Sequence, residues 1–394
     1  MLCHIFSPVT LCFLSFPLEG KMGMVFKNCD SPLFLFTFLF SSPFKYVMVY
    51  DIIIIIVYIT SLKERRPTPM PGFTTHYIFG MKAYNDLPNN QLKHIIAKHR
   101  WLYQLGLQGP DMFFYYIPVL RHRDYRNVGS YMHEHHVNEF FRCSLNRISH
   151  LKSKQQREQA IAYIAGFMNH YIADYVCHPY VYGRIGYDTS NPSAVHHGKH
   201  AALENDIDAI LLYKYKKKKP SEFNQTATIC LNGQEMQFVS HFLANCINDA
   251  YYPITYRNNF QVTPAMVHRS IWAMRVGCRT LADKSGKKKG SIAMVESIFV
   301  SHPIASAKLV TDTFSDPRKC CNLNHEPWCN PWNRSLASTD SFVDLFHLTL
   351  RKLNTVYYFF NTCLTSSVPL EEQDFHQLLT ELGNYSYHSG LPVD

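Results

Sequence analysis

A chain of 394 residues, 46% of them hydrophobic and 18% charged, is long enough to bury a large core and has the composition of an ordinary globular protein rather than a disordered one. Its formal charge of +9 favours an anionic partner such as phospholipid, a phosphate ester or nucleic acid. Much of this charge lies in 214-KYKKKK-219 and 287-KKK-289, and such runs are more typical of solvated loops or helix ends than of a binding groove.

The first 69 residues differ in character from the rest of the chain. They contain 33-LFLFTFLF-40 and 52-IIIII-56, but no window reaches the roughly 20 consecutive apolar residues of a membrane helix without a charge or a proline. The next methionine, Met70, opens a segment of ordinary character. We expect translation to start there, with residues 1–69 outside the domain and the protein in the cytoplasm; the alternative is a poor membrane anchor.

Apolar residues at three- and four-residue spacing predict helices over most of the remaining chain. The expected helices cover residues 89–106, 133–150, 155–182, 199–217, 235–250, 264–283, 291–313, 339–363 and 370–383. The segment 226–239 contains an Asn-Gly pair and predicts a small hairpin, whereas 183–198 and 315–339 predict loops. We therefore expect one all-α domain, with a histidine-rich helical core over residues 70–220 and a helical C-terminal part over 221–394.

The twelve cysteines do not predict a disulfide framework. Three of them lie before residue 70, the other nine contain no Cys-x-x-Cys spacing, and Cys320 and Cys321 are adjacent. A reducing compartment is the expected setting.

Histidines are concentrated in the N-terminal part of the predicted domain, where 13 of the 21 fall between residues 76 and 200. In 170-HYIADYVCH-178, the residues His170, Asp174 and His178 stand at four-residue intervals. Each such step turns about 400° around an α-helix, so the three side chains share one face. Burying that face is costly unless something pairs with these groups.

A second helix repeats the spacing with His200, Glu204 and Asp208 in 200-HAALENDID-208. A histidine and a carboxylate four residues apart can reach the same cation from one rigid helix. The two helices offer more groups than the usual three or four ligands of one zinc ion. They therefore predict a site for several metals, with a carboxylate such as Asp174 as a bridge; the alternative is a set of helix-stabilising pairs.

Other metal and phosphate chemistries have no signature in this sequence. It lacks the Glu-x-x-His spacing of di-iron bundles, the His-Glu-x-x-His motif of metalloproteases, adjacent His-Asp pairs and a phosphate-binding glycine-rich loop.

The order of the polar motifs resembles the zinc-dependent phospholipase C family, and more closely its bacterial phospholipase C/D domain proteins, whose chains begin Met-Pro-x-x-Thr-His. The motifs are 76-HYIFG-80, 107-LQGPDMFFYY-116, 131-YMHEHHVNEFF-141, 166-GFMNHYIADYVCHPYV-181 and 200-HAALE-204. The resemblance runs from about Met70 to Asp208. It continues weakly through 325-HEPWCNPW-332, where no role is predicted for His325, Trp328 or Trp332.

The resemblance implies an all-α multi-helix bundle of the zinc-dependent phospholipase C and single-strand nuclease type, enclosing two or three zinc ions. Carried over motif by motif, the implied ligands are His76, Asp111, His133, His170, Asp174, His178, His200 and Glu204. Asp111 would also be the catalytic proton acceptor, and His133 is preferred over its neighbours because it occupies the family's Met-His-Glu position. The founding enzymes use an N-terminal Trp that this chain does not supply, so an ion beside His76 would need other groups.

The activity implied is zinc-dependent, phospholipase C-like hydrolysis of a phosphodiester by metal-activated water, which Asp111 would orient or deprotonate. A phospholipid or another phosphodiester is the expected substrate, with peripheral membrane contact. Two alternatives stay open. One is a single-strand nuclease-like phosphodiesterase, although nucleic acid is less expected because the lysine runs lie away from the ligand motifs. The other is a metal-binding protein without turnover. The head group, the number of zinc ions and the oligomeric state are not predicted.

Overall fold

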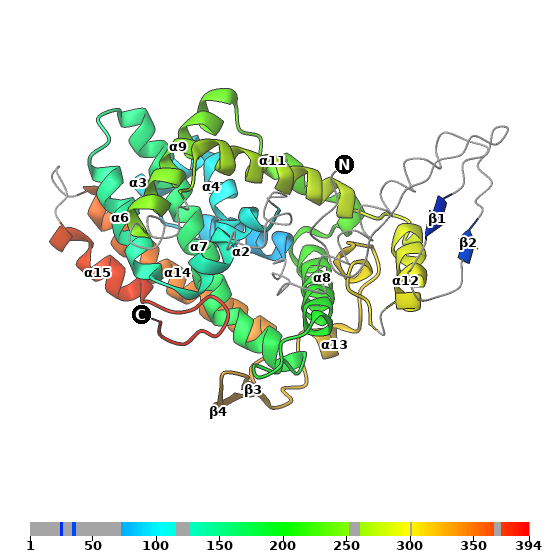
Figure 1. Cartoon of the computed structure of the whole chain (residues 1–394). Coiled ribbons are helices and arrows are strands. Elements are labelled where there is room, and N and C mark those ends of the chain that lie inside the picture. Colours follow the sequence, from blue (N-terminus) through cyan, green and yellow to red (C-terminus); the bar gives the residue numbers. More distant parts are fainter. Residues whose placement is uncertain are drawn as a thin grey trace. The chain divides into compact units, whose positions relative to one another are not determined.

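The computed structural model describes residues 24–26, 34–36, 72–115, 127–251, 261–299, 302–365 and 372–393 (Figure 1). The chain divides into two compact units, Met1–Tyr58 and Ile59–Asp394. In the first, β1 (Met24–Phe26) pairs antiparallel with β2 (Phe34–Phe36). The expectations for Met70 lie outside the described residues, and the domain boundary there stays a prediction. Within the described ranges, no helix combines the length and apolar character of a membrane span.

The second unit is helical, and the predicted all-α class is confirmed. Its first half contains α2 (Phe73–Asp86), α3 (Gln91–Lys98), α4 (Arg100–Gly106), the 3₁₀ helix η1 (Gly109–Tyr115), α5 (Val128–Glu134), α6 (Val137–Ser149), α7 (Lys154–Arg184) and α8 (Ala194–Lys216). Its second half contains η3 (Pro220–Glu222), η4 (Gln225–Thr228), α9 (Gly233–Ala250), α11 (Pro264–Leu281), α12 (Lys287–Phe299), η5 (Ser306–Lys308), α13 (Pro317–Cys320), α14 (Phe342–Thr365) and α15 (Glu372–Leu382). The antiparallel pair β3 (Trp328–Asn330) and β4 (Asn333–Ser338) precedes α14.

Helix α7 is the central element of this unit and packs against α2, α3, α4, α6, α9 and α14 (Figure 1). It is 31 residues long and is buried on all sides from Gln159 to Tyr182, as expected for a helix that is apolar around most of its circumference. The closest packing is with α4, where Gly106 meets Gly166. A Cβ atom on either glycine would collide with backbone of the other helix, so the two helices touch main chain to main chain.

The predicted hairpin over residues 226–239 is wrong. Instead, η4 is followed by α9, whose N-cap is Asn232. The Asn232 side chain accepts a hydrogen bond from the Glu235 backbone N–H, and the Glu235 carboxylate accepts one from the Asn232 N–H. This capping box makes the Asn-Gly pair the start of a helix rather than a turn.

The expected helix over 291–313 is also wrong in its second half, because α12 ends at Phe299. The buried Glu296 carboxylate accepts hydrogen bonds from the backbone N–H groups of Ile304, Ala305 and Ser306. These bonds fold the chain back against α12 as a loop and η5, where the apolar spacing alone had suggested a continuing helix.

Smaller corrections concern helix ends and loops. The expected helix 133–150 is divided at His136, which has φ 47° and is the N-cap of α6. The expected helix 89–106 is divided at His99. The predicted loop 183–198 ends earlier because Ser193 caps α8, and the loop 315–339 contains α13, β3 and β4.

Candidate metal centre

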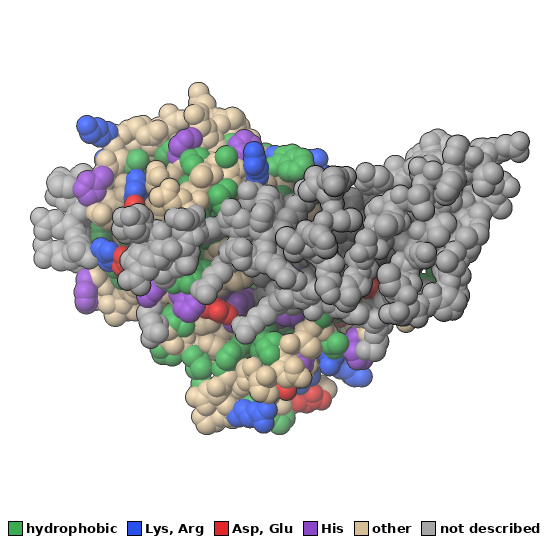
Figure 2. Space-filling view, in the orientation of Figure 1, with side chains coloured by type: hydrophobic (Ala, Val, Ile, Leu, Met, Phe, Trp, Pro, Cys, Tyr) green, Lys and Arg blue, Asp and Glu red, His purple; other side chains and the backbone are tan. Residues whose placement is uncertain are grey.

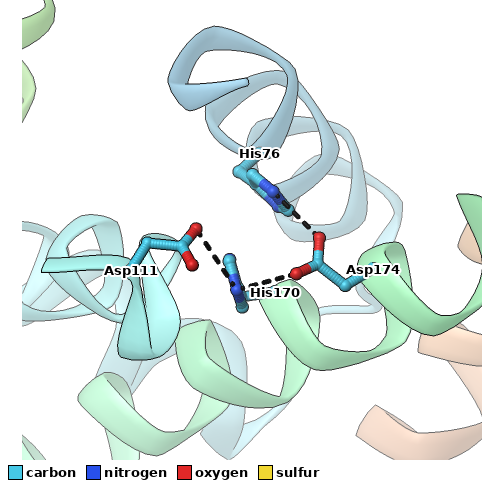
Figure 3. Close-up of side chains that lie close together, drawn as sticks. All are labelled: His76, Asp111, His170 and Asp174. Carbon is cyan, nitrogen blue, oxygen red and sulfur yellow. Dashed lines mark ion pairs between the residues drawn. The ribbon is translucent and has the colours of Figure 1, made fainter. Parts of the chain in front are cut away.

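The buried face of α7 carries the predicted series, and Asp174 lies at its centre. Its Oδ1 atom is 3.1 Å from Nε2 of His76 on α2, and its Oδ2 atom is 3.1 Å from Nε2 of His170 (Figure 3). The same Oδ2 is 3.8 Å from Nε2 of His133 on α5 and 3.7 Å from Nδ1 of His178. The two oxygens of Asp174 thus face imidazoles from three different helices, which is the placement expected of a bridging carboxylate.

Asp111 approaches the same place from η1. Its Oδ1 is 3.1 Å from Nε2 of His133 and its Oδ2 is 3.5 Å from Nε2 of His170. The approach depends on Gly109, which has φ 47° and where a Cβ would collide with the His170 ring. Potential ligand atoms of four residues lie within 4.8 Å of one another, and we call them the first group: His76, Asp111, His170 and Asp174. His133 adjoins this group through both carboxylates.

A second group joins α7 to α8. Nε2 of His178 is 3.3 Å from Oε1 of Glu204, and Nε2 of His200 is 2.9 Å from the same oxygen. The ligand atoms of these three buried residues also lie within 4.8 Å of one another. Because His178 lies near Asp174 as well, the two groups are neighbours, and the structure brings all eight predicted ligands together.

Backbone carbonyl groups fix the rings of three histidines. In each case Nδ1 lies within hydrogen-bond distance of a carbonyl oxygen: His133 with Gly129 at 2.6 Å, His170 with Leu107 at 3.2 Å and His178 with Tyr387 at 2.9 Å. When the ring is neutral, donation from Nδ1–H to the carbonyl leaves Nε2, which faces the carboxylates, with its lone pair free. This second interaction is the usual way in which proteins orient a metal-binding histidine.

Several buried polar atoms of the two groups have no hydrogen-bond partner of good geometry among the described residues. They are His76 Nδ1, both oxygens of Asp111, His170 Nε2, Asp174 Oδ2, both ring nitrogens of His200, and Glu204 Oε2. Burying such atoms unsatisfied is costly, and natural proteins rarely do so without a reason. A divalent cation would satisfy them, and imidazole nitrogens with carboxylate oxygens are the donors that zinc prefers besides thiolates. The residues therefore fit zinc.

The charges of the two groups complement one another when no metal is bound. Burial opposes protonation of His178, but the carboxylates of Asp174 and Glu204 outweigh burial and raise its pKa to about 9. Asp174 acts in the same way on His76, raising its pKa. Burial likewise opposes the negative charge of Asp174, yet the surrounding histidines lower its pKa well below the usual range. Protons thus occupy positions that a metal ion would take over.

Asp208, the third member of the α8 series, turns out to have a different task. Its buried carboxylate accepts hydrogen bonds from the N–H groups of Thr74 and Thr75, at 3.1 and 2.7 Å, and from the Thr75 hydroxyl at 2.6 Å. These donors form the first turn of α2, where the carboxylate also complements the helix dipole. Asp208 therefore ties α2, which carries His76, to α8, which carries Glu204.

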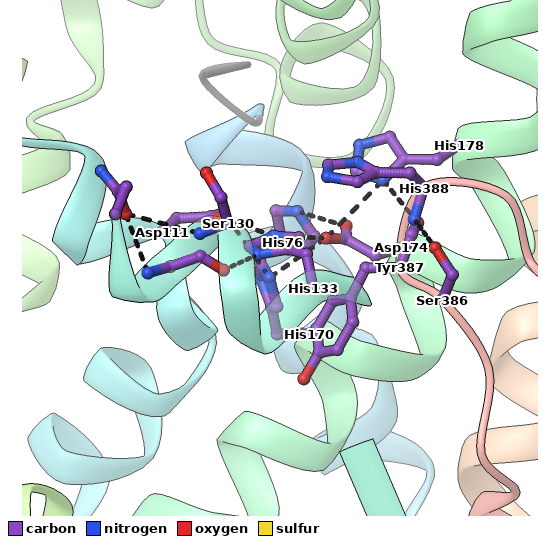
Figure 4. A network of polar contacts seen from close by, with 12 residues as sticks. His76, Asp111, Ser130, His133, His170, Asp174, His178, Ser386, Tyr387 and His388 are labelled. Carbon is purple, nitrogen blue, oxygen red and sulfur yellow. Dashed lines mark hydrogen bonds and ion pairs between the residues drawn. The ribbon is translucent and has the colours of Figure 1, made fainter. Parts of the chain in front are cut away.

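The C-terminal segment, residues 384–393, contributes groups that the sequence did not predict (Figure 4). Besides the carbonyl that accepts from His178, Tyr387 donates its N–H to the His133 carbonyl at 2.9 Å. The buried ring of His388 stacks on His133 with a centroid distance of 5.0 Å, and its Nδ1 is 3.2 Å from the Tyr182 hydroxyl. Burial lowers the pKa of His388 well below its ordinary value, so the ring is neutral. No spacing in the sequence connects these residues with α7.

Aromatic residues of the loop before α14 also reach this region. The Trp332 ring lies 4.8 Å from that of Tyr182, which in turn lies 4.7 Å from the His200 ring. By contrast, Trp328 donates to the Asp340 carbonyl and packs edge-on against Tyr180 of α7. His325 lies near the Thr339 carbonyl and 3.7 Å from the Asp344 carboxylate of α14. On the face drawn in Figure 2, histidine and acidic side chains gather among hydrophobic ones.

Comparisons with known proteins agree with the geometry. The family model described as zinc-dependent phospholipase C matches residues 75–256, a range that contains all eight predicted ligands. No curated protein and no solved structure shows significant similarity to the chain. The family match and the two clusters of potential ligands together support a zinc-dependent hydrolase. The resemblance expected from the motifs is thereby confirmed: residues 75–256 match the family model of zinc-dependent phospholipase C.

Proposed function

We propose that the protein is a zinc-dependent phosphodiesterase of the phospholipase C type, acting on a phospholipid or a similar phosphodiester. The observation that carries the proposal is the convergence of eight buried imidazoles and carboxylates, from α2, η1, α5, α7 and α8, in two neighbouring groups centred on Asp174 and Glu204. The family match over residues 75–256 supports it.

In this proposal, the first group together with His133 would hold zinc, and His178, His200 and Glu204 would hold zinc beside it. Bound zinc would supply the two things that phosphodiester hydrolysis needs, a lowered pKa for water and neutralisation of charge on the phosphoryl oxygens. The chain's own task is to hold the ligands in place. The carbonyl groups at Gly129 and Tyr387 keep their histidine rings in the productive orientation.

Asp111 is the proposed proton acceptor. Both of its oxygens are buried and lack hydrogen-bond partners of good geometry among the described residues. No backbone N–H therefore competes for these oxygens, and they can take a proton from an attacking water. These oxygens lie 3.1 Å from Nε2 of His133 and 3.5 Å from Nε2 of His170, beside the proposed zinc ligands.

Three substrates test the proposal: phosphatidylcholine, single-stranded DNA and a soluble chromogenic phosphodiester. We expect zinc-loaded protein to hydrolyse phosphatidylcholine and the chromogenic compound, and a chelator to abolish both activities. Turnover of DNA but not of lipid would instead indicate a nuclease. Full zinc content without hydrolysis of any of the three would indicate a metal-binding protein that does no catalysis.

A further inference from the structure

The C-terminal end of α8 carries a dense group of lysines. Lys214 and Lys216 lie on its last turn, Lys217 is its C-cap with φ 54°, and Lys218 and Lys219 follow directly. The side chains of all five are exposed. Cationic side chains at a helix C-terminus complement the negative end of the helix dipole, so these lysines stabilise the end of α8.

Tyrosine rings lie among these lysines. Four lysine ammonium groups lie over tyrosine rings: Lys82 over Tyr215 at 5.0 Å, Lys214 over Tyr215 at 5.5 Å, Lys216 over Tyr77 at 5.7 Å and Lys217 over Tyr213 at 5.7 Å. Tyr213 is 55% exposed. We call these side chains, with Lys218 and Lys219, the lysine–tyrosine surface; it joins the end of α8 to the adjoining face of α2.

The positive charge of this surface is not neutralised locally. Within the ranges that the structure describes, none of its six lysines forms an ion pair with a carboxylate. Glu222, just beyond the run, accepts a hydrogen bond from the Lys219 backbone N–H rather than from its ammonium group. Among the described residues, these six cations therefore have no carboxylate partner and can meet an external negative charge.

We propose that the lysine–tyrosine surface binds the anionic phospholipid surface of a membrane. Lysine ammonium groups gain energy near a negatively charged bilayer, and tyrosine is enriched at the boundary between head groups and acyl chains. This inference rests on the proposed function, since it supplies the contact by which an enzyme acting on phospholipid reaches its substrate.

A bilayer fits this surface better than nucleic acid does. Binding of single strands depends on aromatic faces that are open for base stacking, and on arginine, whose planar group stacks and pairs with phosphate in two places. Here the run contains no arginine, and ammonium groups lie over the rings of Tyr77, Tyr213 and Tyr215. Lysine ammonium groups are strongly hydrated and sit on flexible stems, which suits the spread-out negative charge of phospholipid head groups.

The lysines at the end of α8 are separate from the metal centre. Glu204 and Lys216 are twelve residues apart on α8, which corresponds to about 18 Å along the helix axis. This separation exceeds the screening length of about 8 Å at physiological salt, so changes in one place should leave the other unaffected. Membrane binding and hydrolysis of a small soluble substrate can therefore be measured independently.

The test is sedimentation of the full zinc-loaded chain with vesicles of phosphatidylcholine, prepared with and without phosphatidylserine. The test variant is K217Q/K218Q/K219Q. Its matched control is K287Q/K288Q/K289Q, which removes the same charge from the first turn of α12. We expect binding only to vesicles that contain phosphatidylserine, weakening as salt is added. The test variant should lose affinity by on the order of fivefold per lysine, and the control should bind nearly as well as the unaltered protein.

Each other outcome overturns the proposal in a recognisable way. Absence of binding to phosphatidylserine vesicles, or equal losses in both variants, would reject this surface as the membrane contact. Tighter binding to a single-stranded oligonucleotide, lost in the same variant, would assign the surface to nucleic acid. Hydrolysis of the soluble chromogenic phosphodiester distinguishes failure of this proposal from failure of the proposed function. Vesicle binding without hydrolysis would reject only the enzymatic activity. Hydrolysis without vesicle binding would reject only the membrane surface.

Discussion

Helices α7 and α8 and the C-terminal segment over residues 384–393 contribute to the same candidate metal centre in different ways. The helices present His170, Asp174, His178, His200 and Glu204 at a regular spacing. The C-terminal segment presents a backbone carbonyl, a backbone N–H and the neutral ring of His388, with no regularity in its sequence. Helical spacing thus supplies the candidate ligands, whereas distant loops and helix ends determine how those ligands are held.

The largest expected effect comes from removing a ligand candidate of α7. His170→Ala should abolish zinc binding at the first group and lower phosphodiesterase activity by more than about a hundredfold. Replacing even a residue that only supports a metal ligand lowers metal affinity or activity by about 10–100-fold. Zinc content per chain and chromogenic turnover measure this. His241→Ala is the control, because His241 is an exposed histidine on α9 whose ring bonds only within its own helix. Unchanged zinc content in His170→Ala would contradict the assignment.

The next effect is the dependence of zinc affinity on pH. His178 has a folded-state pKa of about 9, so at pH 7 the metal-free protein must release this proton when zinc binds. Affinity should therefore rise with pH up to about 9, by about tenfold per unit for one proton released. Calorimetry in buffers of different ionisation enthalpy measures the protons, and a binding enthalpy that does not vary among the buffers would argue against ligation by His178.

The same shift predicts the stability of the metal-free protein. Because the folded-state pKa of His178 is raised above its ordinary 6.5, its contribution to the free energy of unfolding is complete below pH 6.5. That contribution is lost as pH rises through about 9. Thermal unfolding of chelated protein across this range should show the loss, and zinc-loaded protein should not.

A smaller effect is expected from loosening the tie between α8 and α2. Asp208→Asn removes a charge that accepts three hydrogen bonds at the start of α2, and should weaken zinc binding at the first group by about 10–100-fold while sparing the second group. Zinc titration, together with the visible spectrum of the cobalt-substituted protein, distinguishes metal binding at the first group from metal binding at the second group. Asp206→Asn is the matched control two residues earlier, where the carboxylate accepts from the exposed Ser315 N–H. Equal losses in both variants would mean that Asp208 only stabilises the fold.

The smallest effect concerns the support of His388. Tyr182→Phe removes one buried hydroxyl that pairs with the His388 ring, and should lower the free energy of unfolding by about 1 kcal/mol with zinc content unchanged. Chemical denaturation measures the difference. Tyr358→Phe, at a ring that is 66% exposed, should show none. Loss of zinc in Tyr182→Phe would give the C-terminal segment a more direct part in metal binding.

Elements with strong helical periodicity were predictable from the sequence. The helices expected at 155–182 and 264–283 agree closely with α7 and α11. The failures have local causes that periodicity does not record: a capping box at Asn232 begins a helix where a turn was expected, and the Glu296 carboxylate ends α12 early.

The candidate site was predictable to a similar degree. The spacing on α7 and α8, with the motifs around His76, Asp111 and His133, indicated the eight candidate ligands that the structure brings together, although their role as zinc ligands stays a proposal. The partners of Asp208 and the position of His388 were not predictable, because they depend on contacts between segments more than 100 residues apart in the chain. Such contacts produce no periodic pattern in the amino-acid sequence.

The main-chain contact between Gly106 and Gly166 has a consequence for how the protein can vary. Gly106 stands five residues before Asp111, and Gly166 stands one helical turn before His170. A single methyl group at either glycine would force α4 and α7 apart, and with them the carboxylate and the imidazole that face each other further along the chain. The geometry of the candidate site is in this way sensitive to crowding at a buried helix contact outside it.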